Sequence, residues 1–86
     1  MSTARYRAFV AVAHHGSLSA AARALQLSQP TISAQIGALE QHSPVELFHR
    51  RGYRMSLSSA GAQLLPIAQK ILALEAEADF FLRDSG

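Results

Sequence analysis

The middle of this 86-residue sequence holds a run of small and polar residues that is interrupted once, by Ile32. The residues of the run are Ser28, Gln29, Pro30, Thr31, Ser33 and Ala34. A glutamine side chain can pair with N6 and N7 of adenine, and serine or threonine hydroxyls suit several bases. The apolar surface of proline or alanine can contact a thymine methyl group. Carried on the outer face of a helix, this segment could therefore contact base edges in a DNA major groove.

A second group of residues has the charge to bind an anion: Arg50, Arg51 and Arg54, with Gly52 and Tyr53 among them. Residues 1–54 hold six arginines against two glutamates, whereas residues 55–86 hold two basic and four acidic residues. The sequence pI is about 9.7. Positive charge gathered in one part of a chain suggests an anionic partner. An ordinary solvated surface remains the alternative, since only 16% of the residues are charged.

Three helices are expected to position the first group. Apolar residues spaced by three and four predict a helix over residues 3–15. We expect a second helix over 19–26 with Ser19 as its N-cap, and a third over 29–41 with Ser28 as its N-cap. Two helices joined by a short turn, the second with a polar outer face, form a helix-turn-helix.

The third helix should turn its apolar stripe inward, through Ile32, Ile36 and Leu39. Pro30 fits because it lies in the first turn, where the backbone N–H groups have no partner within the helix. The small and polar residues then face outward near the helix N-terminus, where helix-turn-helix proteins contact bases. The residues also fit a three-helix protein-interaction domain whose third helix is merely exposed.

A β-hairpin is predicted after the third helix. Residues 45–49 and 53–57 can form short strands around the turn Arg50-Arg51-Gly52, in which glycine supplies the positive φ. Two arginines would then lie at the tip of the hairpin. Glu40 stands alone in this basic region, and we expect an ion pair between Glu40 and Arg50 at the hairpin's base.

A long helix is expected from about residue 59 to residue 83, with Ser58 or Ser59 as its cap. Its apolar residues alternate at spacings of three and four, which is typical of a coiled-coil seam: Leu64, Ile67, Ile71, Leu74, Ala78 and Phe81. Leu65, Ala68 and Leu72 add a second apolar face. One face can close the core of the domain, so the other needs a partner.

From Phe9 through Leu72 the sequence resembles the DNA-binding region of LysR-type transcriptional regulators. The matching segments, in order, are Phe9-Val-Ala-Val-Ala13, Gly16-Ser-Leu-Ser-Ala-Ala-Ala-Arg-Ala-Leu25, Ser28-Gln-Pro-Thr-Ile-Ser-Ala-Gln-Ile36, Leu39-Glu40, Leu47-Phe-His-Arg50 and Leu57-Ser-Ser-Ala-Gly61. The resemblance implies a mainly α fold. Residues 1–58 would form a winged helix-turn-helix of three helices and a short β-hairpin wing, and residues 59–86 a linker helix for dimerisation.

The resemblance also implies sequence-specific binding of double-stranded DNA in a bacterial transcription regulator. The outer residues of the third helix would face the major groove, and Arg51 or Arg54 would lie at the minor groove, with Ser28, Arg50 and Tyr53 completing the contact set. A dimer would bind an interrupted inverted repeat. In the family an effector-binding domain follows, which senses a small-molecule inducer and completes a tetramer. We expect that domain to be absent from this chain, as from an excised module.

Four departures from the family pattern alter the expected contacts. Ala34 stands where many members have arginine, and Gly37 where many have a basic or polar residue. The third helix therefore lacks an arginine for bidentate guanine pairing, which predicts readout weighted toward A·T pairs and shape. Ser43-Pro44 replaces the usual Leu-Gly, so the wing angle can differ. Tyr53 replaces a frequent arginine, which leaves open which wing residue enters the groove.

Other classes of protein have less support. The chain has no cysteine, which excludes disulfides and thiolate metal sites. Its longest apolar run, Ala8–Ala13, is far shorter than the roughly 20 residues of a membrane span, and we expect a cytoplasmic protein. The four histidines lack metal-ligand spacing, and we interpret Glu75, Glu77 and Asp79 as a solvated face. We therefore expect no enzyme, metal or cofactor. A protein-interaction module and a winged-helix repressor of another family remain the alternatives.

Overall fold

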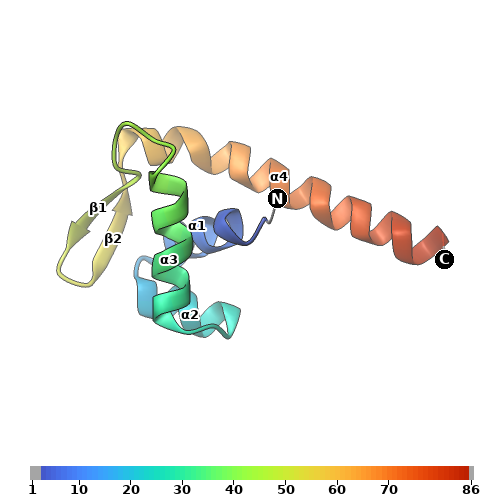
Figure 1. Cartoon of the computed structure of the whole chain (residues 1–86), viewed down its shortest axis with the longest axis horizontal. Coiled ribbons are helices and arrows are strands. Elements are labelled where there is room, and N and C mark those ends of the chain that lie inside the picture. Colours follow the sequence, from blue (N-terminus) through green and yellow to red (C-terminus); the bar gives the residue numbers. More distant parts are fainter. Residues whose placement is uncertain (1–2, 86) are drawn as a thin grey trace.

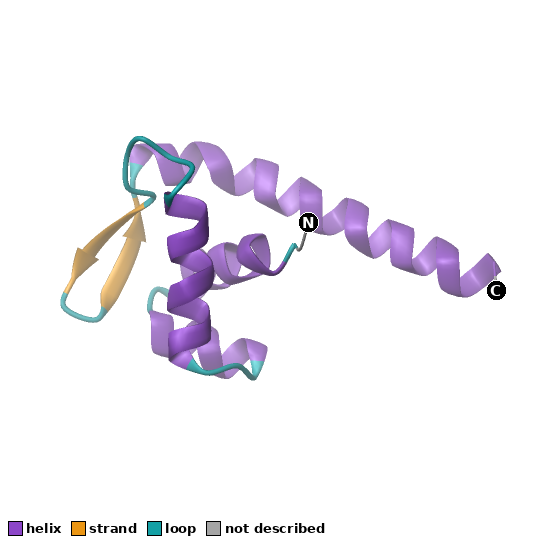
Figure 2. Cartoon of the chain, in the orientation of Figure 1, coloured by secondary structure: helices purple, strands orange, loops and turns teal. Residues whose placement is uncertain are grey.

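The computed structural model of the chain describes residues 3–85. Three packed helices are followed by a two-stranded antiparallel hairpin and by a long helix that projects from the rest (Figure 1). The elements, in chain order, are α1 (Ala4–His15), α2 (Leu18–Leu25), α3 (Gln29–Glu40), β1 (Phe48–Arg51), β2 (Arg54–Leu57) and α4 (Ser59–Ser85). The expected architecture, mainly α with one hairpin and a long last helix, is confirmed (Figure 2).

One apolar core joins the helices to the hairpin. Phe9 of α1, Ile32 and Ile36 of α3 and Phe48 of β1 are completely buried. The rings of Phe9 and Phe48 pack with their centroids 5.3 Å apart. Ala68 of α4 is also completely buried, so the first half of α4 closes this core. We call α1, α2, α3 and the hairpin together the head.

The connection between α1 and α2 fixes the hairpin against the helices. Gly16 ends α1 in the left-handed region, with φ at 80°, and its carbonyl accepts a hydrogen bond of 2.8 Å from the N–H of Met55. Ser17 forms an isolated antiparallel bridge with Arg54. The hairpin is therefore held by backbone hydrogen bonding to a segment almost forty residues earlier in the sequence.

The N-cap expected for the second helix is wrong by two residues. Helix α2 begins at Leu18, and the extended residue Ser17 is its N-cap. The Ser17 hydroxyl accepts a hydrogen bond of 3.1 Å from the N–H of Ala20, as an N-cap side chain does for the third helical residue. Ser19 therefore lies inside the first turn.

The turn expected for the hairpin is also wrong. Phe48 pairs with Leu57 and Arg51 with Arg54, so the two-residue turn is Gly52-Tyr53. Gly52 has a φ of 58°, which matches the positive φ that two-residue hairpin turns need. The strands are set by burial, because Phe48 and Met55 must both face the core. Arg50 and Arg51 therefore belong to β1 instead of the tip.

Helix α4 starts at a tightly packed junction. The Ser58 hydroxyl accepts from the N–H of Gly61 at 3.1 Å and donates to the carbonyl of Glu46 at 2.6 Å, so Ser58 acts as the cap. The Ser58 N–H donates to the carbonyl of Leu47 at 3.0 Å. These bonds join α4 to the segment that enters β1. Further along, α4 continues as a helix through Pro66.

Candidate nucleic-acid interface

The N-terminal half of α3 presents the expected small and polar face to solvent. Ile32, Ile36 and Leu39 are buried, as the spacing predicted. The other residues singled out on this helix are exposed: Gln29, Pro30, Thr31, Ser33 and Ala34. Gly37 has nothing within 4 Å of the position that a Cβ would take. This face could therefore approach a flat or grooved partner closely.

Ser28 caps α3, as expected, and shares a hydrogen bond with the next hydroxyl on this face. Its side chain accepts from the N–H of Thr31 at 3.2 Å, and its Oγ lies 2.8 Å from Oγ1 of Thr31. Either hydroxyl can be the donor. Two hydroxyl groups that share one hydrogen bond leave one O–H free to donate to a partner.

The start of α3 and the hairpin turn line one groove. Its lining comes from α2, from the start of α3 and from both sides of the hairpin turn: Leu18, Ser19, Gln29, Arg50, Gly52, Tyr53 and Met55. The groove therefore brings Gln29 of the first group beside Arg50 and Tyr53 of the second. The remaining singled-out residues do not line it: Ser28, Pro30, Thr31, Ser33, Ala34, Arg51 and Arg54. Gln29 contributes to this groove and also to a neighbouring one beside Pro30 and Ser33.

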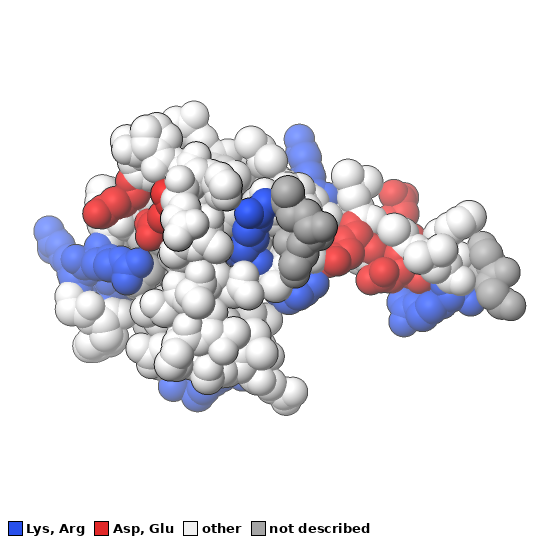
Figure 3. Space-filling view, viewed as in Figure 1, with Lys and Arg blue, Asp and Glu red and all other residues white. Residues whose placement is uncertain are grey.

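The end of the hairpin is basic and exposed. Arg51 and Arg54 are directly opposite each other on the two strands, and both are exposed. Tyr53, in the turn, is 82% exposed. Figure 3 shows basic side chains gathered over this end of the molecule. Like charges on opposed strand positions repel each other, so a polyanion at this end would relieve that repulsion.

Arg50 has a structural partner. Its Nη2 lies 3.6 Å from Oε1 of Glu40, which confirms the expected ion pair. The other carboxylate oxygen of Glu40 accepts a hydrogen bond of 3.1 Å from the N–H of Leu47. Glu40 therefore connects the end of α3 to the start of the hairpin. Arg50 is half-exposed and keeps donors available beyond this pair.

The predicted dimerisation residues do not all share one environment. Leu64 packs against the core of the head, together with Leu65. Ile67, Leu74 and Phe81 are more than half exposed, and Ala78 is exposed as well. An apolar stripe therefore runs along the outside of α4, at an angle to the face that covers the head. Ile71 is intermediate in exposure, between the two faces.

The interpretation of Glu75 as part of a solvated face is wrong. Its carboxylate accepts a hydrogen bond from the Thr3 hydroxyl and forms an ion pair of 2.9 Å with Arg7. The residues come from opposite ends of the chain, so no local sequence pattern could have indicated this contact. Glu77 and Asp79 are exposed, as expected.

The described part of the chain shows neither a metal-binding cluster nor a membrane-spanning helix. Within residues 3–85, no group of three or more histidine, cysteine or carboxylate residues is arranged to hold a metal ion. Over that same range no helix has the length and apolarity to cross a membrane.

Together, the capped and exposed third helix, the adjoining basic hairpin and their shared core define a winged helix-turn-helix of the DNA-binding class. The family model described as the bacterial regulatory helix-turn-helix protein, lysR family, matches residues 3–62. The chain belongs to this LysR family.

Curated relatives agree with this assignment. An uncharacterized HTH-type transcriptional regulator of Azotobacter vinelandii is 47% identical over 74 residues, which cover 86% of this chain and 51% of that protein. The transcriptional regulator TfdS of Cupriavidus pinatubonensis is 46% identical over 74 residues, covering 86% of this chain and 25% of that protein. The chain thus spans about half the length of the first relative and a quarter of the second. Both relatives are HTH-type transcriptional regulators.

Solved structures of the same architecture include two complexes with DNA. The DNA-binding domain of CbnR in complex with DNA superposes with a TM-score of 0.87 at 35% identity, covering 99% of this chain and 98% of that one. The DNA-binding domain of BenM with benA site 1 DNA gives a TM-score of 0.85 at 27% identity and covers both chains fully. The chain is a LysR-type helix-turn-helix DNA-binding domain.

Proposed function

We propose that this chain binds an interrupted, A/T-rich inverted repeat as a homodimer, with α3 in the major groove and the hairpin wing at the minor groove. The observation that carries the proposal is the groove in which Gln29 of α3 lies beside Arg50 and Tyr53 of the hairpin. One duplex could contact both elements at once, because the start of α3 and the hairpin turn line the same groove.

The A/T preference follows from the side chains on α3. Gln29 is exposed and can pair with adenine, whereas Ala34 and Gly37 offer no donor to guanine. Pro30 and Ala34 supply apolar surface for thymine methyl groups. Thr31, whose hydroxyl is paired with that of Ser28, would contribute one donor between the two of them.

Affinity would come mainly from the wing. Arg51 and Arg54 are the exposed cations at the end of the hairpin, and A·T-rich minor grooves attract arginine because they are narrow and strongly negative. Tyr53 would contact the sugar-phosphate backbone from the turn. Arg50 would serve both the ion pair with Glu40 and the groove wall.

The dimer would form through the exposed stripe of α4. Ile67, Leu74 and Phe81 have no cover in a single chain, and their spacing suits packing against an identical helix. In this proposal residues 1–58 bind DNA and residues 59–86 dimerise, although Leu64 and Ala68 also serve the head's core. In the whole cytoplasmic regulator, a further domain would bind a small-molecule inducer and join dimers into a tetramer.

The experiment that tests the proposal is selection of sites from a pool of random duplex DNA at physiological salt. We expect an A/T-rich inverted repeat with a fixed spacing between its halves. Tight binding without a sequence pattern would contradict readout by α3. No binding by folded, dimeric protein would favour the protein-interaction alternative.

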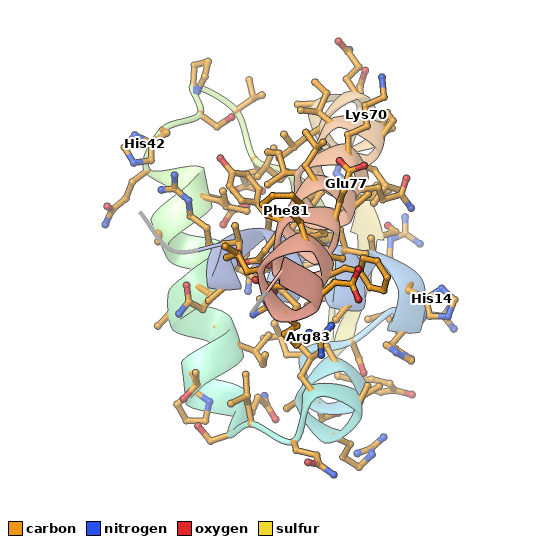
Figure 4. All side chains as sticks on the ribbon, turned by 90° about the vertical axis from the view of Figure 1, so that its right-hand side faces the viewer. His14, His42, Lys70, Glu77, Phe81 and Arg83 are labelled. Carbon is orange, nitrogen blue, oxygen red and sulfur yellow. The ribbon has the colours of Figure 1, made fainter. Side chains whose placement is uncertain are left out.

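The role of the wing is tested by the salt dependence of binding to the selected site. Each phosphate contact contributes about 0.9 to the slope of log K against log salt. Arg51→Ala and Arg54→Ala should each lower the affinity and reduce this slope by about 1 if the side chain contacts a phosphate. Lys70→Ala is the matched control, because Lys70 is an exposed cation on α4 instead of the hairpin (Figure 4). Unchanged slopes in both arginine variants would refute the role of the wing.

A further inference from the structure

A small polar cluster ties the head to α4 well beyond the apolar core. Nη2 of Arg7 donates to Oε1 of Glu75 at 2.9 Å and lies 3.3 Å from Oγ1 of Thr3. The Thr3 hydroxyl donates to the other carboxylate oxygen, Oε2, of Glu75. We call Thr3, Arg7 and Glu75 the clamp. None of its residues lies in the groove beside α3 or on the exposed apolar stripe of α4.

The clamp lies farther along α4 than the apolar contacts with the head. Ala68 is completely buried against the core, and Glu75 follows seven residues later on nearly the same helix face. From residue 76 to residue 84 every residue of α4 is exposed. Leu64 and Leu65 also pack on the core, so the apolar contacts hold the first part of α4 against the head. The clamp lies about 10 Å beyond Ala68 along the helix, at 1.5 Å per residue. The apolar contact fixes the position of α4, and the clamp fixes its direction.

The direction of α4 decides where α3 lies relative to a dimer axis. In Figure 1, α3 begins at the end of the head farthest from α4. The molecule measures 26 Å along its second axis. A head of that depth turning by about 10° around Ala68 would move its far end by roughly 4 Å, more than the rise of about 3.4 Å per base pair. A small loss of angular control thus corresponds to one base pair of spacing.

We propose that Glu75, held by Arg7 and Thr3, is a positioning residue that sets the spacing between the two half-sites which the dimer accepts. The inference rests on the proposed dimeric reading of an inverted repeat. Glu75 does not contact DNA in this proposal. It acts by keeping each head at one angle to its own α4, so that the two recognition helices meet the duplex at one separation.

The clamp is suited to set an angle without carrying the fold. The side chains of Arg7 and Glu75 keep 48% and 35% of their exposure, and ion pairs as open as this contribute little to stability. Removing the pair should therefore leave the head folded and the apolar stripe of α4 unchanged. The expected loss is confined to the geometry of the dimer on DNA.

The test measures affinity for the selected inverted repeat and for versions with the spacer lengthened or shortened by one and two base pairs. For the wild-type chain we expect one preferred spacing. Glu75→Gln should reduce the preference over the one-base-pair variants at least threefold, while binding to a duplex with a single half-site stays unchanged. The charge exchange Arg7→Glu with Glu75→Arg should restore part of the preference, because the ion pair re-forms in reverse.

Glu77→Gln is the matched control, since it removes the same charge two residues further along α4. Figure 4 looks along α4 and shows Glu77 on the opposite side of the helix from Arg83, and Glu77 is exposed. A wild-type preference that Glu75→Gln and Glu77→Gln leave equally intact would overturn the role of the clamp alone. A wild-type chain without any preferred spacing would overturn the proposed dimeric reading, and the clamp's role with it.

Discussion

Gly61, in the first turn of α4, lies where a side chain has no room. A Cβ built on Gly61 would lie 2.1 Å from the carbonyl oxygen of Leu47 and 3.0 Å from a methyl carbon of Leu57. The nearest atom belongs to the backbone and cannot rotate away. That same carbonyl accepts the hydrogen bond from Ser58 that joins α4 to the hairpin. Gly61→Ala must therefore move the junction between the two elements.

The cost of this substitution can be estimated from three terms. Overpacking a tight site costs roughly 1–3 kcal/mol. Weakening the Leu47–Ser58 hydrogen bond adds about 0.5–1.5 kcal/mol. The higher helix propensity of alanine returns at most about 1 kcal/mol. The net loss is about 2 kcal/mol, which for a domain of this size lowers Tm by roughly 8–16 °C.

The assay is thermal unfolding followed by circular dichroism, at one protein concentration because the proposed dimer would melt in a concentration-dependent way. Gly37→Ala is the matched control. Gly37 also lies in a helix, but nothing is within 4 Å of its Cβ position. The control should gain up to about 1 kcal/mol from helix propensity and melt at the same temperature or higher. The two substitutions should thus shift Tm in opposite directions.

The result that would refute the reasoning is a Gly61→Ala protein that melts within about 2 °C of the wild type, given that 1 kcal/mol corresponds to several degrees here. In that case the junction between β1 and α4 would yield without cost. The close approach of Leu47 would then be an accident of packing, and no requirement of the fold.

Substitutions at the cap of α2 and at Glu40 test the contacts that build the head. Ser17→Ala should cost about 1 kcal/mol by removing the cap of α2, whereas Ser19→Ala should cost less than about 0.5 kcal/mol; equal losses in thermal melts would contradict the assignment of the cap. Glu40→Ala should cost about 1–2 kcal/mol because it leaves the N–H of Leu47 without its acceptor. Glu40→Gln, which keeps an acceptor and loses only the ion pair with Arg50, should cost less than half as much in urea unfolding.

The spacing of residues predicted the helices well, because burial and capping in a helix depend on residues only three or four positions apart. The alternation of buried residues in α3 and the cap at Ser28 both follow from residues three and four apart. The same locality explains the error at α2. Ser17 and Ser19 are both good caps, and the choice depends on the bridge between Ser17 and Arg54, which no local pattern reveals.

The hairpin turn was misplaced for a similar reason. Arg50-Arg51-Gly52 and Gly52-Tyr53 both offer a glycine with positive φ, and the turn rules alone do not separate them. The register is decided by the core, where Phe48 packs on Phe9 of a distant helix. The contact of Glu75 with Arg7 was missed because 68 residues separate the two positions. The Glu40–Arg50 pair was predictable because few partners were available nearby.

In the proposed function, the hairpin supplies affinity and α3 supplies sequence preference, because α3 has no basic side chain. With Ala34 and Gly37 on its outer face, α3 carries no cation that could hold a phosphate or pair with guanine. Arg50, Arg51 and Arg54 lie instead on the hairpin. The position of the hairpin depends on Glu40 at one side and on Gly16 and Ser17 at the other. A substitution that removes one of these contacts and loosens the hairpin should therefore reduce the affinity for all DNA sequences alike. A substitution on the outer face of α3 should instead alter which DNA sequence is preferred. A single substitution in Glu40 can separate these two effects, because Glu40 pairs with Arg50 but does not line the groove that Arg50 shares with Gln29. We expect the affinity to fall while the selected sequence stays the same.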